Sequence, residues 1–177
     1  TVNNVNDAPT ITSEAVFTAE ENQTSVGTVE ASDPEDNTLS YSISGNELQI
    51  DSSTGVITFV SAPDYETKSS YTSTVTASDT TLSDSQEITV TITDVDDTAP
   101  VITTSSVESS IEEGDTALGS VSANETVTWS LGGTDVDYVS ISSDGTLILN
   151  SEADYETKTS YSFTVTATDT AGNAAIT

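Results

Sequence analysis

The stretch DYETK at residues 64–68 recurs unchanged at residues 154–158, which is an offset of 90 positions. The segment VTASDT at residues 75–80 recurs as VTATDT at residues 165–170, again at an offset of 90. Two matches at one fixed offset are typical of an internal repeat. The sequence therefore predicts two copies of one domain.

Shorter matches locate the boundary between the copies. The segment NDAP at residues 6–9 is matched by DTAP at residues 97–100, with one inserted residue. We therefore expect one repeat over residues 1–97 and a second over residues 98–177.

Within each copy, the side chains alternate with a period of two. Val and Thr dominate these runs, as they do in half-buried pleated strands, and turn signals such as Thr54-Gly55 and Asp144-Gly145 separate the runs. No segment has a helical stripe. The pattern predicts an all-β chain of antiparallel β-sandwiches, each with roughly seven strands. One face is expected to carry Tyr71, Ser73, Val75 and Ala77 in the first copy and Tyr161, Phe163, Val165 and Ala167 in the second, with Ile88, Val90 and Ile92 on a further strand.

The charge of the chain excludes several partners. Two basic residues stand against 30 acidic ones, for a formal net charge of −28. Nucleic acid is excluded as a partner because phosphate contacts need Lys and Arg, and an anionic membrane surface is disfavoured for the same reason. The natural partners of this surface are cations.

The chain contains no Cys, no His and no Arg. Zinc, copper and haem sites are therefore disfavoured, and the common bases and nucleophiles of catalysis are missing. Coordination of a hard cation by oxygen atoms alone remains open. We expect no enzymatic activity. No signal peptide or membrane-inserting segment is recognisable, and we interpret the chain as a monomeric piece of a longer protein.

The acidic residues gather in a few places. One group lies at Glu20 and Glu21, a second at Asp64 and Glu66, and a third in the segment DVDD at residues 94–97. The first two groups are expected to meet the third at one end of the first repeat. Several carboxylates in a small volume repel one another unless a cation lies among them, and Ca²⁺ takes 6–8 oxygen ligands.

These residues resemble the repeats of cadherins, most closely the cadherin-like modules of large bacterial surface adhesins of the RTX, type I secreted kind. Glu21 is similar to the Glu near the family's first strand, DYE at residues 64–66 to its D-R-E tripeptide, and DVDDTAP at residues 94–100 to its D-x-N-D-N-x-P linker. Asp79 and Asp169 are similar to its late Asp. The resemblance implies two tandem cadherin/Ig-like Greek-key sandwiches joined by a calcium-binding linker.

The resemblance also implies the metal ligands. One or two sites are expected from Glu21, Asp64, Glu66, Asp94 and Asp97, with a carbonyl from Val95. A further site would use Asp96, the Thr98 carbonyl, Asn124 and Asp169, but the second repeat has Asn124-Glu125 where the family has a D-x-D turn. Fewer than three Ca²⁺ ions are therefore expected at the junction. The outer ends carry half-sites, at Asn6, Asp7, Asp33, Glu35, Asp36 and Asp79 and at Glu113, Asp154 and Glu156.

The implied function is that of an extracellular, cell-surface extender segment, in which Ca²⁺ stiffens a tandem array of neighbouring repeats and so projects a region that binds a ligand. The alternative is a module that contacts a glycan or protein directly. A third hypothesis is an accessory module of a secreted polysaccharide-degrading enzyme. Trp129 and the pair Asp135 and Asp137 are interpreted as a core aromatic and a solvated loop, and Lys68 and Lys158 as partners of nearby acids.

Overall fold

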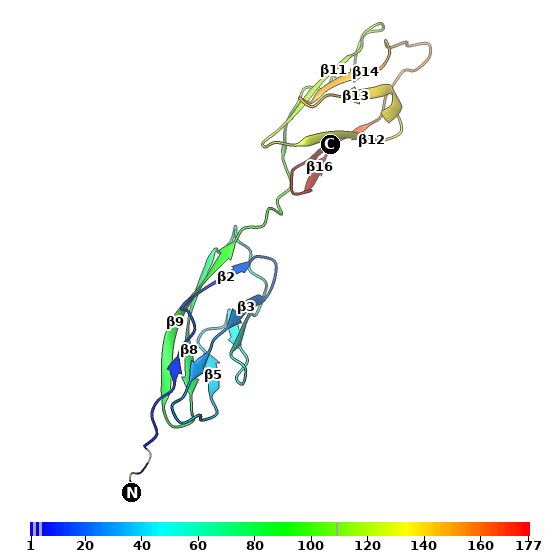
Figure 1. Cartoon of the computed structure of the whole chain (residues 1–177). Coiled ribbons are helices and arrows are strands. Elements are labelled where there is room, and N and C mark those ends of the chain that lie inside the picture. The colour runs from blue at the N-terminus through cyan, green and yellow to red at the C-terminus, as the bar shows by residue number, and fades with distance from the viewer. Residues whose placement is uncertain (2, 4, 109) are drawn as a thin grey trace. The chain divides into compact units, whose positions relative to one another are not determined.

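The computed structural model describes residues 1, 3, 5–108 and 110–177. These residues form two compact units, Thr1–Val95 and Asp96–Thr177 (Figure 1). The sequence-based division after residue 97 differs from this boundary by two residues and stays a proposal about the repeat unit. In the described part of the chain, no helix is both long and apolar enough to cross a bilayer.

The first unit is built from two sheets and a small β-ribbon. One sheet has the strand order β2-β9-β8-β5, the other has the order β3-β7-β6, and β1 pairs with β4. The strands are β1 (Thr10–Ile11), β2 (Val16–Glu20), β3 (Ser25–Thr28), β4 (Ala31–Ser32), β5 (Ser40–Ile43), β6 (Leu48–Ile50), β7 (Val56–Phe59), β8 (Ser70–Ser78) and β9 (Ser83–Thr93).

Strand pairing in the first unit is antiparallel with one exception. β2 runs parallel to β9, with Val16 opposite Thr89 and Glu20 opposite Thr93. The sequence predicted antiparallel sheets only. The difference arises because the N-terminal segment changes its partner. β1 pairs with β4, and after residue 15 the chain leaves this ribbon and pairs with β9 as β2.

The core of the first unit lies between its two sheets. Ile88 and Val90 of β9 are fully buried and Ile92 is nearly so, whereas of the intervening residues Thr89 is half-buried and Thr91 is exposed. On β8, Val75 and Ala77 are fully buried as well. The alternation predicted for both strands is confirmed, and apolar burial of this kind is the main favourable contribution to folding.

The second unit repeats the arrangement with fewer paired residues. One sheet has the order β10-β11-β14-β13 and the other has the order β12-β15-β16. The elements are β10 (Ile102–Ser105), β11 (Ala117–Ala123), β12 (Thr128–Gly132), the 3-10 turn η1 (Val136–Tyr138), β13 (Val139–Ile141), β14 (Thr146–Leu149), β15 (Thr164–Thr168) and β16 (Ala174–Ile176). Trp129 packs against the core of this unit and lies opposite Ala167, as Tyr41 lies opposite Ala77. Its assignment as a core aromatic is confirmed.

One predicted strand of the second unit is shorter than expected. The alternation from Tyr161 to Ala167 predicts a strand like β8, but β15 begins only at Thr164. Tyr161 and Phe163 are half-buried and pack against the core without belonging to a strand. β8 is nine residues long because β9 pairs with all of it, whereas β16 pairs only with Thr166, Ala167 and Thr168.

Candidate metal centre

Glu21 is the most enclosed acid of the chain, with 3% of its surface exposed. It follows β2 directly, and its backbone N–H donates to the carbonyl of Thr93 at the end of β9. Its carboxylate accepts two backbone hydrogen bonds, to Oε2 from Tyr65 N–H and to Oε1 from Val95 N–H, each at 2.8 Å. Glu21 therefore holds three segments together: the end of β2, the loop before β8 and the end of β9.

Glu66 and Asp94 complete a carboxylate cluster around Glu21. One oxygen from each of the three side chains lies within 4.8 Å of the others, and Glu66 and Asp94 are exposed. Lys68, the only basic residue of this repeat, donates instead to both carboxylate oxygens of Glu47, at 2.6 and 2.7 Å. Three carboxylates in one place, with the nearby lysine bonded elsewhere, form an all-oxygen donor set of the kind that Ca²⁺ prefers.

Asp64 and Val95 border this cluster in different ways. Asp64 binds the next turn of its own loop, since its carboxylate accepts hydrogen bonds from the N–H and hydroxyl of Thr67 at 3.0 and 2.9 Å. Each of its two oxygens accepts one of these bonds and keeps a lone pair for a cation, but Asp64 does not group with the other three acids. Val95 contributes its N–H to Glu21.

The remaining predicted ligands belong to the second unit; they are Asp96, Asp97, Thr98, Asn124 and Asp169. Within the part of the chain that the structure describes, the three acids of this set do not form a close group. Asn124 binds the chain just after the linker, because its Oδ1 accepts a hydrogen bond from Val101 N–H at 2.7 Å. Asp97 and Thr98 are exposed. A metal-binding role for these positions therefore stays a proposal.

Asp169 and Asp96 are connected through a residue that the sequence analysis missed. The side chain of Asn173 donates to Asp169 Oδ2 at 2.9 Å and to the Asp96 carbonyl at 3.0 Å. Burial raises the pKa of Asp169, but hydrogen bonds from Asn173 and Gly172 outweigh it, so the pKa is lowered overall. Asn173 lies only four residues after Asp169. An amide side chain so close to a candidate ligand is the sequence feature that could have identified this contact.

A second group of three acids lies in the second unit and shares two of its three positions with the first group. Glu113, Asp154 and Glu156 each offer an oxygen within 4.8 Å of the others, and all three are exposed. They occupy the positions in the second repeat that Glu21, Asp64 and Glu66 occupy in the first. The second unit therefore carries the same kind of acidic set, although without a buried member.

The opposite end of the first unit carries the predicted half-site. Asn6 donates to Asp79 Oδ2 at 2.7 Å and accepts from the side chain of Asn37 at 2.9 Å. Asp33 accepts backbone hydrogen bonds through Oδ1 from Glu35 and Asn37, while its buried Oδ2 has no partner within the described part of the chain. The acids of this end thus form a connected network.

Comparison with known proteins identifies the type of domain. Residues 15–93, which are the body of the first unit, match the family model "Cadherin: Cadherin domain". Cadherin-99C of Drosophila melanogaster is 34% identical over 172 residues, which covers 88% of this chain. The chain spans only 10% of that relative.

Two solved structures show the same fold over nearly the whole chain. The first two extracellular cadherin domains of human Protocadherin-24 have a TM-score of 0.70 at 23% identity and cover 97% of this chain and 93% of that one. Drosophila N-cadherin domains 1 to 4 have a TM-score of 0.62 at 20% identity and cover 97% of this chain and 48% of that one. At these identities the likeness concerns the fold alone.

The chain is therefore an all-β protein whose first unit matches the cadherin domain model and whose two units share the fold of paired cadherin domains, which confirms the fold class predicted from the sequence. Cadherin domains are non-enzymatic adhesion modules, in agreement with the expectation that this chain is not an enzyme. They bind Ca²⁺ at their linkers, and the donor set of Glu21, Glu66 and Asp94 fits that ion in charge and in ligand type.

Proposed function

We propose that this chain is a calcium-binding extender segment of an extracellular adhesin. The observation that carries the proposal is the cluster of Glu21, Glu66 and Asp94, in which a carboxylate with 3% exposure is held by the N–H groups of Tyr65 and Val95. Burial of such a group without a lysine or arginine beside it is costly, and a bound cation relieves that cost.

The proposed ion acts on the linker. Asp94 and Val95 leave the first repeat and lead directly into Asp96, Asp97 and Thr98. A cation held by Glu21, Glu66 and Asp94 restrains the backbone at the start of this linker. Asp64, Asp97 and the Val95 carbonyl are proposed as its further ligands, and a second ion is proposed for Asp96, the Thr98 carbonyl, Asn124 and Asp169. Without the ion, the acidic linker repels itself and is flexible.

The proposal also includes the biological setting of the chain. We assign the segment to the outside of a cell, in a long array of neighbouring repeats, by analogy with the extracellular cadherin domains that share its fold. Extracellular calcium modules bind with Kd of about 10⁻⁴–10⁻³ M. The assignment to a large bacterial surface adhesin rests on the sequence resemblance alone, and the relatives named above are animal proteins.

Calcium titration tests the site. With Kd in that range, 10 mM Ca²⁺ should stabilise the first unit by about 1.4 to 2.7 kcal/mol relative to chelator, from the binding term RT ln(1 + [Ca²⁺]/Kd). Asp94→Asn and Glu66→Gln should remove most of this gain. Glu30→Gln is the matched control, since it also removes one exposed charge from the first unit but lies outside the cluster.

Two results would contradict the proposal. An equal calcium response in Asp94→Asn, Glu66→Gln and Glu30→Gln would show that the ion only screens the general negative charge. Unchanged small-angle scattering between Ca²⁺ and chelator, in a chain that binds the ion, would refute the stiffening role while leaving the site intact.

A further inference from the structure

The chain has two basic residues, and both lie at the end of the repeated segment DYETK. Each donates to a carboxylate that belongs to a turn distant in sequence. Lys68 Nζ bonds both carboxylate oxygens of Glu47, at 2.6 and 2.7 Å, and Lys158 Nζ lies 2.7 Å from Asp135 Oδ1. Glu47 lies between β5 and β6, and Asp135 lies between β12 and η1.

The two acidic partners occupy equivalent positions in the two repeats. Glu47 and Asp135 each follow by two positions a glycine in the left-handed region, Gly45 (φ +84°) and Gly133 (φ +100°). The two glycines and the two acids are each separated by an offset of 88 positions. The carboxylate thus recurs although its residue type and its neighbours differ. The pairing therefore belongs to the architecture of the repeat rather than to one local sequence.

Each ammonium group also lies over a tyrosine ring. Lys68 Nζ is 4.3 Å from the ring centroid of Tyr71, and Lys158 Nζ is 5.4 Å from that of Tyr161, the equivalent residue at the offset of 90. A cation over an aromatic face adds to the attraction of the carboxylate. The pair in the second unit is the more enclosed one, with 28% of the Lys158 side chain and 13% of the Asp135 side chain exposed.

In the first unit, the lysine fixes the end of a loop that carries a candidate metal ligand. At the start of this loop, Tyr65 N–H donates to Glu21 Oε2 at 2.8 Å. The Asp64 carbonyl accepts a hydrogen bond from Lys68 N–H at 2.9 Å, which closes one turn. The Lys68 side chain then ties that turn to the connection between β5 and β6. Glu66 lies between the two attachments and is exposed, so burial does not fix its position.

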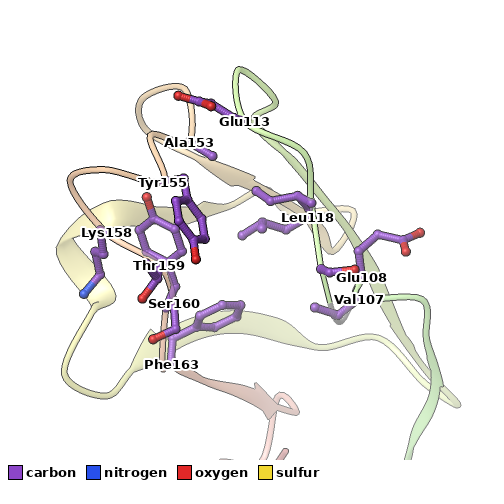
Figure 2. Close-up of a pocket in the computed structure, with 13 residues that line it drawn as sticks. Val107, Glu108, Glu113, Leu118, Ala153, Tyr155, Lys158, Thr159, Ser160 and Phe163 are labelled. Atoms are coloured by element: carbon purple, nitrogen blue, oxygen red, sulfur yellow. The ribbon is translucent and has the colours of Figure 1, made fainter.

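In the second unit, the lysine points away from the acidic group. Figure 2 shows the Lys158 side chain directed away from Glu113, which forms this group with Asp154 and Glu156. A lysine bonded to these acids would compete with a metal ion for them. Because it bonds Asp135, Lys158 instead attaches the loop and leaves the three carboxylates to a cation.

We propose that Lys68 and Lys158 are positioning residues for calcium, each of which clamps its DYETK loop in the conformation that binds the ion. This proposal rests on the calcium-binding function proposed above and adds two residues outside the ligand set. A preorganised loop binds more tightly because it loses less conformational freedom on binding. Loss of the lysine should therefore weaken calcium binding, although removal of a positive charge would by itself attract the cation more strongly.

Calcium titration of the isotope-labelled chain tests the clamp, followed by NMR at the backbone amides of Tyr65 and Val95, which both donate to Glu21. Lys68→Met should raise the Kd at this site about two- to fivefold, as expected for the loss of an exposed ion pair. Lys68→Arg keeps the pair and should restore the parental Kd. Lys158→Met is the matched control, because it removes the same charge from the second unit and should not raise this Kd.

A measurement without metal tests the same clamp. In chelator, Lys68→Met should speed hydrogen exchange at the backbone amides of Tyr65 and Thr67, whereas Lys68→Arg and Lys158→Met should not.

Several outcomes would overturn the proposal. If the parent and Lys68→Met bind calcium with equal Kd, or if Lys68→Met binds it more tightly, the clamp is refuted while the metal site stands. An equal rise of Kd in Lys68→Met and Lys68→Arg would also refute it, because the ion pair would not be the cause. If calcium leaves the Tyr65 and Val95 signals of the parent chain unchanged, the proposed function itself fails, and the clamp fails with it.

Discussion

Single carboxylates at the turns of this chain are held by backbone N–H groups. Asp79 Oδ1 accepts hydrogen bonds from Thr81 and Leu82, each at 2.7 Å, and Asn6 donates to its Oδ2. The hydrogen bonds from Leu82, Asn6 and Thr81 lower the pKa of Asp79 below its ordinary value of 3.8, although burial opposes them. The same feature, a carboxylate that closes a turn, recurs at Asp169.

The lowered pKa of Asp79 makes the stability of the first unit depend on pH. Because the folded state favours the ionised form, the stabilising contribution is complete well above pH 3.8 and is lost as the pH falls through the lowered folded value. Asp79→Asn should therefore flatten the fall of stability as the pH drops below about 5, as measured by urea unfolding followed by circular dichroism. NMR titration of the carboxyl carbon should place the Asp79 midpoint below 3.8.

Glu30→Gln serves as the control, because Glu30 is exposed and should leave the acid dependence as it is in the parent chain. A titration midpoint for Asp79 above 3.8, or an unchanged acid slope in Asp79→Asn, would contradict the hydrogen-bond account.

At the residue level, the sequence allowed the composition of the acidic cluster to be predicted but not its internal contacts. Glu21, Glu66 and Asp94 were expected together because the duplicated spacing and the resemblance to cadherin repeats named them. The N–H donors of Tyr65 and Val95 were not foreseen, because no side-chain pattern records where a backbone N–H points. Asn173 was missed for a similar reason, since an amide in a turn is common and carries no metal signature.

At the scale of elements, one turn recurs in both sandwiches with a glycine in the left-handed region. Gly145 (φ +83°) precedes β14, and its carbonyl accepts from Val121 N–H at 3.0 Å; Gly55 (φ +71°) makes the same contact with Val29 in the first unit at 2.9 Å. A Cβ at Gly145 would overlap the backbone oxygen of Val121. The turn therefore needs glycine twice over, for its φ angle and for the close backbone approach.

Gly145→Ala should consequently destabilise the second unit by about 2–4 kcal/mol, from the strain of a positive φ together with the displaced Val121 strand. Gly114→Ala is the matched control in the same unit, because Gly114 also has a positive φ (+91°) but has no atom within 4 Å of the added Cβ. Gly114→Ala should lower the free energy of unfolding only by the cost of placing alanine at a positive φ, about 1–2 kcal/mol. Equal losses in the two variants, measured by Trp129 fluorescence in urea, would show that the approach of Val121 is unimportant.

The strands themselves were largely predictable, because an alternation of period two is preserved wherever one face is buried. β8 and β9 show this in Val75, Ala77, Ile88 and Val90. The exceptions were relations between strands. The parallel pairing of β2 with β9 depends on which sheet the chain joins, and the late start of β15 accompanies its short pairing with β16. Neither pairing is recorded in the alternation of a single segment.

For the molecule as a whole, 30 acidic residues are opposed by only two lysines, which gives the net charge of −28. Both lysines are bonded locally. Lys68 pairs with Glu47 and lies over the ring of Tyr71, while Lys158 pairs with Asp135 at 2.7 Å and lies near Tyr138 and Tyr161. The bond to Asp135 is the main reason that the pKa of Lys158 is raised. The rest of the acidic surface repels itself and relies on solution ions.

Raising NaCl from about 10 mM to about 1 M should therefore raise the unfolding midpoints of both units by several degrees, since the screening length falls from roughly 30 Å to roughly 3 Å. Differential scanning calorimetry in chelator checks this without a contribution from calcium. A flat or falling midpoint would mean that the acidic groups are already neutralised within the fold. Sodium sulfate is unsuitable as the control salt, because it strengthens apolar burial by itself. Tetramethylammonium chloride at equal ionic strength is the better choice.

The scarcity of basic residues also limits cleavage by one class of proteases. Trypsin-like proteases cut after Lys or Arg, and this chain of 177 residues offers them two bonds, after Lys68 and Lys158. Each of those side chains is already engaged by a carboxylate and a tyrosine ring, so neither can enter a protease's specificity pocket without first breaking those contacts. The same scarcity of lysine that leaves the acidic surface with few internal counter-charges thus leaves few cleavage sites for a common class of digestive enzymes.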